Sequence, residues 1–116
     1  MEDRKGEWPM PILYLHAPFD KTQQGSGAFY KDFFTILKNC VGPDYAIYGT
    51  LIGQVRPGIK AVVFDRARQL RAEGVVSAVT PKPSTRIQRY DVHIPNLTKV
   101  PYTDPPPVNR CGIAVV

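Results

Sequence analysis

Apolar runs separated by polar stretches predict the first elements of the chain. Residues 11–17 are almost wholly apolar and are followed by Pro18, which indicates a short buried strand. Apolar residues then recur at the spacing of one helical face. This spacing predicts a helix that begins near a cap at Ser26, runs to about Cys40 and is stopped by Gly42 and Pro43. The apolar face consists of Phe29, Phe33, Ile36, Leu37 and Cys40.

The middle of the chain predicts two strands and a second helix. Residues 45–53 are rich in β-branched and aromatic side chains and are interpreted as a strand, followed by a turn at Pro57-Gly58. Residues 59–64 are then a third strand, which we expect to form a hairpin with the second. Asp65 is a plausible N-cap for a short helix over residues 66–73 that Gly74 ends.

Prolines change the character of the last third of the sequence. Residues 75–79 predict a brief strand, and residues 85–93 alternate in polarity as a strand does. Seven of the twelve prolines follow residue 80. Proline fixes φ and lacks a backbone donor, so we expect an extended arm after residue 95 rather than a helix or a central strand. The final apolar residues, 111–116, can form a strand at its end.

The predicted order is β-α-β-β-α-β followed by this arm. Such an order is typical of an α+β two-layer sandwich with ferredoxin-like topology. We therefore expect an α+β domain over residues 1–95 and a proline-rich arm over residues 96–116. The terminal strand has two possible receivers, the sheet edge of its own domain or that of a second subunit.

Composition indicates a globular chain with no obvious cofactor. Apolar residues make up 43% of the 116, and no apolar run is long enough to span a membrane. The first residues are charged and differ from a signal peptide. Cys40 and Cys111 lie far apart and match no metal spacing, so we expect reduced thiols, no metal, no cofactor and a cytoplasmic location.

Positive charge is concentrated in the second half. Residues 54–116 carry ten Lys and Arg against four Asp and Glu, whereas residues 1–53 carry five against six. A basic surface of this kind attracts phosphate backbones, and Tyr90 offers a ring on which a base can stack. Weak nucleic-acid binding is therefore one alternative function, and a solvated surface is the other interpretation. The basic candidates are Arg56, Lys60, Arg66, Arg68, Arg71, Arg86 and Arg89.

The two histidines suggest a second alternative, a small enzyme. His16 and His93 each end a predicted strand, and each is followed by an apolar residue and a proline. Two histidines in one cleft can perform general acid–base chemistry near neutral pH. The setting is similar to that of two-histidine phosphoesterases, which carry His-x-Ser/Thr on two strands; here Pro18 and Pro95 occupy the hydroxyl positions.

The stretch that begins at Pro11 resembles the opening of small tautomerases. In that family an N-terminal proline is the general base, which implies β-α-β units and a catalytic Pro11. This role requires that Pro11 become the free amino terminus, because an amide nitrogen is not a base.

The leading hypothesis is a non-enzymatic association module. The chain shows no phosphate-binding glycine loop, nucleophile elbow or paired catalytic carboxylates. If the apolar residues at the C-terminus paired with no strand, they would be exposed and would promote aggregation. We therefore expect the arm and an uncovered sheet face to build a homo-oligomer or to bind a protein partner. The expected interface residues are Pro105, Pro106, Pro107, Ile113, Val115 and Val116.

Overall fold

Strands dominate the architecture. The computed structural model describes residues 11–18, 32–83 and 87–116, with 43% strand and 12% helix. In chain order the elements are β1 (Ile12–His16), α1 (Phe33–Asn39), β2 (Val41–Ala46), α2 (Gly49–Ile52), β3 (Lys60–Asp65), β4 (Leu70–Val75), β5 (Ala78–Lys82), β6 (Arg89–His93), β7 (Thr98–Val100) and β8 (Ile113–Val115).

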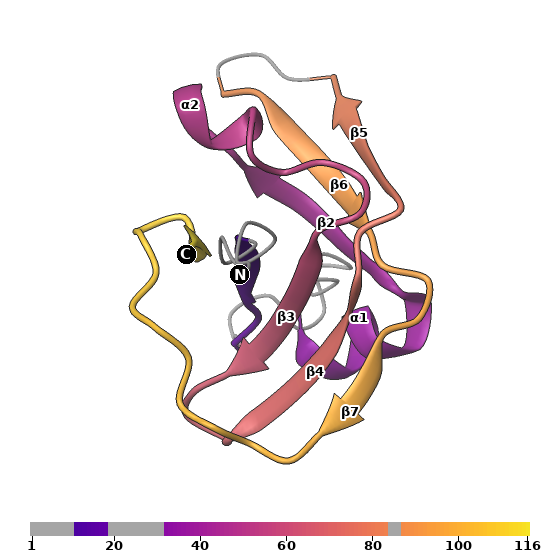
Figure 1. Ribbon diagram of the computed structural model, residues 1–116, viewed down its shortest axis with the longest axis vertical. Coiled ribbons are helices and arrows are strands. Elements are labelled where there is room, and N and C mark those ends of the chain that lie inside the picture. Colours follow the sequence, from indigo (N-terminus) through magenta and orange to yellow (C-terminus); the bar gives the residue numbers. More distant parts are fainter. Residues whose placement is uncertain (1–10, 19–31, 84–86) are drawn as a thin grey trace, which may run out of the picture.

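The larger sheet has five strands in the order β7-β4-β3-β1-β8 (Figure 1). β1 and β3 are parallel, and His16 is in register with Phe64. The other neighbours are antiparallel, including the β3–β4 hairpin. Parallel neighbours need a long crossover, and here it is residues 17–59, whose described part contains α1, β2 and α2.

The smaller sheet has the order β2-β6-β5. Its β2 strand shifts register between Gly42 and Tyr45, where Asp44 has a positive φ of 61°. A proline next to such an irregularity is expected, because Pro43 cannot donate to a regular ladder. Pro81 lies in β5, an edge strand, where its missing donor is tolerated for the same reason.

The core lies between the two sheets and α1. Along β1 the side chains alternate, so Leu13 and Leu15 are fully buried while Tyr14 and His16 face the other side of the sheet. The buried phenol of Tyr45 donates a 2.9 Å hydrogen bond to the backbone oxygen of His16 and links the sheets. Burial raises the pKa of Tyr45, so this donor keeps its proton.

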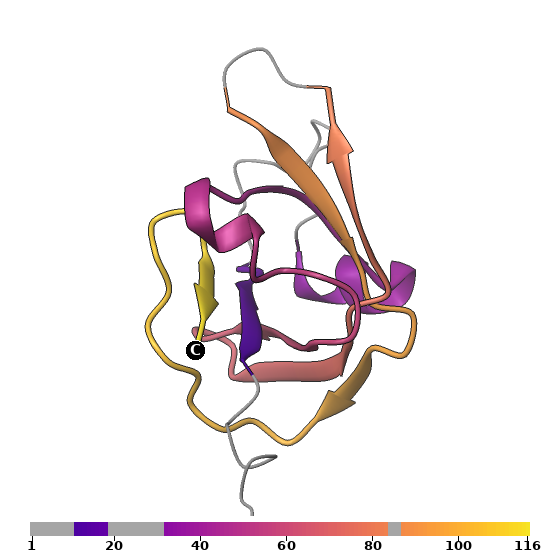
Figure 2. The ribbon, with the colours of Figure 1, turned by 45° about the horizontal axis from the view of Figure 1, so that its top comes forward.

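The proline-rich arm returns to its own domain. β8 adds to the free edge of β1 in antiparallel register, with Leu15 opposite Ile113, and Figure 2 shows the two strands side by side. Before this, residues 101–109 cross the end of the larger sheet. There Arg66 donates to the backbone oxygens of Pro105 and Pro106, at 3.3 and 3.1 Å, and Arg71 donates to that of Thr103 at 3.1 Å.

The predicted ferredoxin-like α+β sandwich is wrong. The chain forms eight strands in two sheets with two short helices in the described residues, instead of one sheet covered by two helices. The predicted strand at residues 11–17 and the third strand are confirmed in outline by β1 and β3. Residues 96–116, which we predicted as an arm, contain β7 in the larger sheet, the segment 101–109 and β8. The first helix ends as predicted, at a left-handed Cys40, but Asp32 caps it in place of Ser26, which lies outside the described residues.

The second predicted helix is absent because its residues complete a hairpin. The Asp65 carboxylate accepts from the amides of Ala67 and Arg68, as an N-cap would. Gln69 then adopts a positive φ of 54° and turns the chain, so residues 70–75 pair with β3. The third strand therefore pairs with β4 and β1, and not with the second strand as predicted. That second strand is itself shifted to residues 41–46, and α2 replaces its end.

Gly74 is a position where close packing requires the absence of a side chain. A Cβ there would lie 2.5 Å from Cγ2 of Ile94, which is fully buried, and 3.2 Å from the backbone of Leu97. We expect Gly74→Ala to lower the free energy of unfolding by about 1–3 kcal/mol, because the core must expand. Urea denaturation measures this change.

The matched control is Gly53→Ala. Gly53 has a φ of −68°, and its nearest neighbour in the direction of a Cβ lies at 3.6 Å. This substitution should leave stability unchanged or raise it by up to about 1 kcal/mol. Equal effects of the two substitutions would contradict the packing described for Gly74.

Candidate functional site

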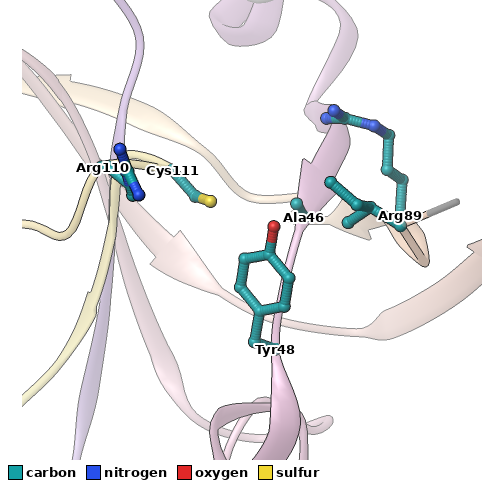
Figure 3. Close-up of a pocket in the computed structure, with 6 residues that line it drawn as sticks. Ala46, Tyr48, Arg89, Arg110 and Cys111 are labelled. Atoms are coloured by element: carbon teal, nitrogen blue, oxygen red, sulfur yellow. The ribbon is translucent and has the colours of Figure 1, made fainter.

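A pocket of about 420 Å³ lies where the smaller sheet meets the end of the arm. Figure 3 shows Arg110 and Cys111 on one side and Ala46 and Arg89 on the other, with the hydroxyl of Tyr48 directed into the space between them. The sixth lining residue is Ile87. The walls therefore come from three segments that are distant in the sequence.

Backbone pairing places the wall formed by the smaller sheet. Ala46 ends β2 and is in direct register with Arg89, the first residue of β6. Two residues after Ala46 the chain leaves the sheet, and Tyr48 occupies the position before α2 with half of its side chain exposed. The start of β6 and the residues that follow β2 thus form one continuous wall.

An asparagine turn places the opposite wall. The Asn109 side-chain oxygen accepts from the amides of Cys111 and Ile113, at 2.9 and 3.1 Å, and its backbone oxygen accepts from Gly112 at 2.9 Å. Gly112 has a positive φ of 79°, which glycine adopts without strain. This turn carries Arg110 and Cys111 directly into β8, so the docking of β8 on β1 determines where they lie.

The pocket is electropositive. Arg89 uses one nitrogen to donate to the backbone oxygen of Asp44 at 3.2 Å, which leaves most of its five donors for another acceptor. The Arg110 side chain makes no hydrogen bond or ion pair within the described part of the chain. No aspartate or glutamate is among the described lining residues. Two guanidinium groups with no lining carboxylate favour an anion as the occupant.

The two histidines are not brought together. His16 lies in the larger sheet, where its ring stacks on Phe64 with centroids 4.9 Å apart. His93 lies in the smaller sheet and its Nε2 is 3.0 Å from the hydroxyl of Thr80. None of the pockets given for the described residues is lined by both histidines, and the catalytic roles predicted for this pair stay predictions.

His16 instead faces the arm. It lines a cleft of about 540 Å³ together with Arg66, Asp104, Pro105, Pro107 and Val108. Its Nε2 is buried and has no hydrogen-bond partner among the described residues. Burial lowers the pKa of His16; the Asp65 carboxylate opposes this shift and the Arg66 guanidinium adds to it. The imidazole is therefore neutral around pH 7, and its neighbours hold the arm rather than a reacting group.

Most of the predicted basic residues have intramolecular acceptors. Arg66 and Arg71 bind the arm, Arg71 and Lys60 also pair with Glu73, and Arg68 pairs with Asp65 and with Asp32. Arg56 is exposed, and Arg86 lies outside the described residues. Of the set that we predicted as a nucleic-acid surface, Arg89 is the member that lines the pocket with Arg110 and Tyr48, hereafter the arginine pocket.

The predicted interface residues lie within the chain's own fold. Pro105 is buried, and Pro105 and Pro107 line the cleft beside His16. Ile113 is buried against β1, whereas Val116 keeps 68% of its surface exposed. The arm therefore docks on its own domain, one of the two receivers that we expected.

Sequence reasoning missed Arg110, Cys111 and Tyr48 as site residues. Arg110 follows Asn109 and precedes Cys111-Gly112, a combination that is typical of a turn before a strand. That signal predicts the turn but not what it faces. Ala46 and Tyr48, which line the opposite wall, precede Arg110 by more than sixty positions in the sequence. Only the pairing of the strands brings these residues to one pocket.

Comparisons with known proteins add no assignment. No protein-family model matches the chain, and no curated protein or solved structure matches it at a significant level. Within the described ranges, no helix is long and apolar enough to cross a membrane, and no three metal-ligating side chains gather as a metal site.

The lowered pKa of His16 predicts a pH-dependent stability. The unfolded chain has the ordinary pKa of 6.5 and binds a proton more readily than the folded chain does. This contribution to stability is therefore fully present above about pH 6.5 and is lost as the pH falls. Asp65, Arg66 and Asp104 are the charged groups around the ring. We expect the free energy of unfolding to decrease from pH 7.5 to 5.5, measured by urea denaturation.

A histidine pair provides the control. His16→Gln should flatten this dependence, because the variant has no group there to protonate. His93→Gln should retain it, since its partner Thr80 lies in the other sheet. A wild-type slope in His16→Gln would show that another group is responsible.

Proposed function

We propose that this protein is a non-enzymatic binding module for an anionic ligand, and that the ligand presents a phosphate group to Arg89 and Arg110. The observation that carries the proposal is a pocket lined by two arginines, with no lining carboxylate among the described residues. Guanidinium donors match the oxygens of phosphate in pairs, and the Tyr48 hydroxyl supplies a further donor.

A binding role fits the lining better than a catalytic one. Arginine remains protonated near neutral pH and cannot act as a base, and neither histidine lines the pocket. The described residues supply charge and hydrogen bonds, which orient and retain a ligand. The pocket thus has what recognition needs, without a proton acceptor poised for chemistry.

Inorganic phosphate is the simplest probe. We expect a nitrogen-15 NMR titration with sodium phosphate to shift the amide signals around Tyr48, Arg89 and Cys111, whereas sodium chloride at equal ionic strength should not. Arg110→Gln should raise the dissociation constant by about tenfold or more, because one charge-assisted interaction is lost. Arg110 is the preferred site for substitution because its side chain has no structural partner to lose.

Arg56→Gln is the matched control. Arg56 is an exposed arginine outside the pocket, so this variant removes the same net charge and should keep the wild-type affinity. Equal losses in the two variants would mean that phosphate responds to overall charge, and the proposed site would be wrong. The absence of any shift up to tens of millimolar phosphate would also reject it.

The pocket couples ligand binding to the docking of the arm. Arg110 and Cys111 reach the pocket only while β8 is paired with β1, so a ligand there stabilises the docked arm by mass action. We expect saturating phosphate to slow hydrogen exchange at the amides of His16 and Val116, which bond between these strands. At ten times the dissociation constant the slowing should approach about tenfold.

The β3–β4 hairpin provides the reference for this measurement. Ala72 lies in β4 and pairs with Val63, away from the pocket. Without ligand, the Val116 amide should exchange faster than that of Ala72, because the edge strand β8 can open without global unfolding. An unchanged exchange rate at Val116 in saturating phosphate would contradict the coupling to the arm.

The association hypothesis stays a proposal of second rank. Because β8 occupies the edge of β1 in its own chain, an oligomer built through the arm requires β8 to exchange between two copies. Nucleic-acid binding has less support, since Arg66, Arg68 and Arg71 are engaged internally. The two-histidine enzyme lacks a shared cleft.

A further inference from the structure

We infer that the ligand of the arginine pocket is a mononucleotide, whose phosphate lies between Arg89 and Arg110 and whose base stacks on Tyr48. This inference rests on the proposed anion-binding function and specifies its ligand class. It follows from the size of the pocket, from the chemistry of its lining and from the free ring of Tyr48.

The pocket is too large for phosphate alone. Its volume of about 420 Å³ lies within the range of about 300–1,000 Å³ that is typical of small-molecule sites. A phosphate group fills a small part of this space. The remainder is bordered by Ala46, Ile87 and the Tyr48 ring, which are apolar surfaces. A ligand that matches the whole pocket therefore joins an anionic group to an apolar one.

The exposed ring of Tyr48 favours a ligand whose apolar group is planar. Its side chain is 49% exposed and is among the largest exposed apolar surfaces in the described chain. It caps no helix nitrogen of α2, and no described ring or cation contacts its ring. A tyrosine held half out of the core beside two arginines offers an open π-face, and bases stack on such rings regardless of their sequence.

The arginines and the tyrosine line the same pocket. Arg89 is in register with Ala46, and Tyr48 follows Ala46 by two residues, so guanidinium and ring border the same cavity. Figure 3 places the Tyr48 ring below the level of the Arg89 and Arg110 guanidinium groups, with its hydroxyl toward them. A sugar can bridge a phosphate at the guanidinium end and a base beside the ring.

A mononucleotide is favoured over a nucleic-acid strand. A strand needs a track of free cations along its backbone. Beyond the pocket, the described arginines near the arm donate to backbone oxygens or to carboxylates. Two arginines with few internal acceptors line this one pocket, which suits one phosphate group better than the backbone of a strand.

Isothermal titration calorimetry with three related probes tests the inference. Inorganic phosphate reports the anion site, ribose 5-phosphate adds the sugar, and adenosine 5′-monophosphate adds the base. We expect adenosine 5′-monophosphate to bind about fivefold to a hundredfold more tightly than ribose 5-phosphate, which is the range that one stacked base contributes. Tyr48→Leu should abolish this preference, and its affinity for ribose 5-phosphate should equal that of Tyr48→Phe, because both variants lack the hydroxyl donor. Tyr48→Phe should retain the preference.

The outcomes separate this inference from the proposed function. If inorganic phosphate and ribose 5-phosphate bind but the base adds no affinity, the inference is overturned and the anion site stands. If none of the three probes binds, the proposed function itself fails. A preference for adenosine 5′-monophosphate that survives in Tyr48→Leu would place the base elsewhere. An adenine oligonucleotide that binds more than tenfold tighter than the mononucleotide would identify a strand as the ligand, and the inference would be wrong.

Discussion

The pairing of β8 with β1 is the interaction on which the rest of the structure depends. β1 is almost entirely buried on its inner face, and its parallel partner β3 protects one edge. Without β8 the other edge would expose unpaired backbone groups beside an apolar core, which is unfavourable and prone to intermolecular pairing. The chain reaches that edge only after residues 101–109 have crossed the end of the sheet. Arg66 and Arg71 hold this extended segment through its backbone oxygens.

That constraint explains why prolines suit the arm. An extended segment that crosses a sheet end forms few ladder hydrogen bonds, so the missing donor of proline carries little penalty there. The fixed φ of proline also reduces the freedom that the unfolded chain loses on docking. Side-chain donors on β4 and on the β3–β4 turn bind the oxygens that no strand satisfies. The prolines are thus part of the intramolecular path of the arm.

The same constraint determines where positive charge is free. Arginines close to the arm, to Asp65 or to Glu73 form hydrogen bonds and ion pairs within the fold. Arg110 lies at the last turn before β8, and Arg89 lines the same pocket from the smaller sheet, with no carboxylate among the described lining residues. A basic half of the sequence therefore becomes two kinds of surface. One is a set of neutralised structural contacts, and the other is a local site with unmatched charge that attracts an anion.

The sequence by itself determined the elements that depend on local chemistry: the buried strand at residues 12–16, the apolar face of α1, the strand at residues 60–65 and the extended course of the proline-rich segment. Tertiary structure decided residues 66–75. A cap-like Asp65 and a following glycine are compatible with a helix or with a hairpin, and pairing with β3 outweighs the high helix propensity of residues 66–73. It also decided the site. Arg89 was recognisable as a basic candidate, but Tyr48 and Arg110 gain their role only when β2, β6 and the turn before β8 meet. Such meetings come from strand pairing between distant residues, which no local pattern encodes.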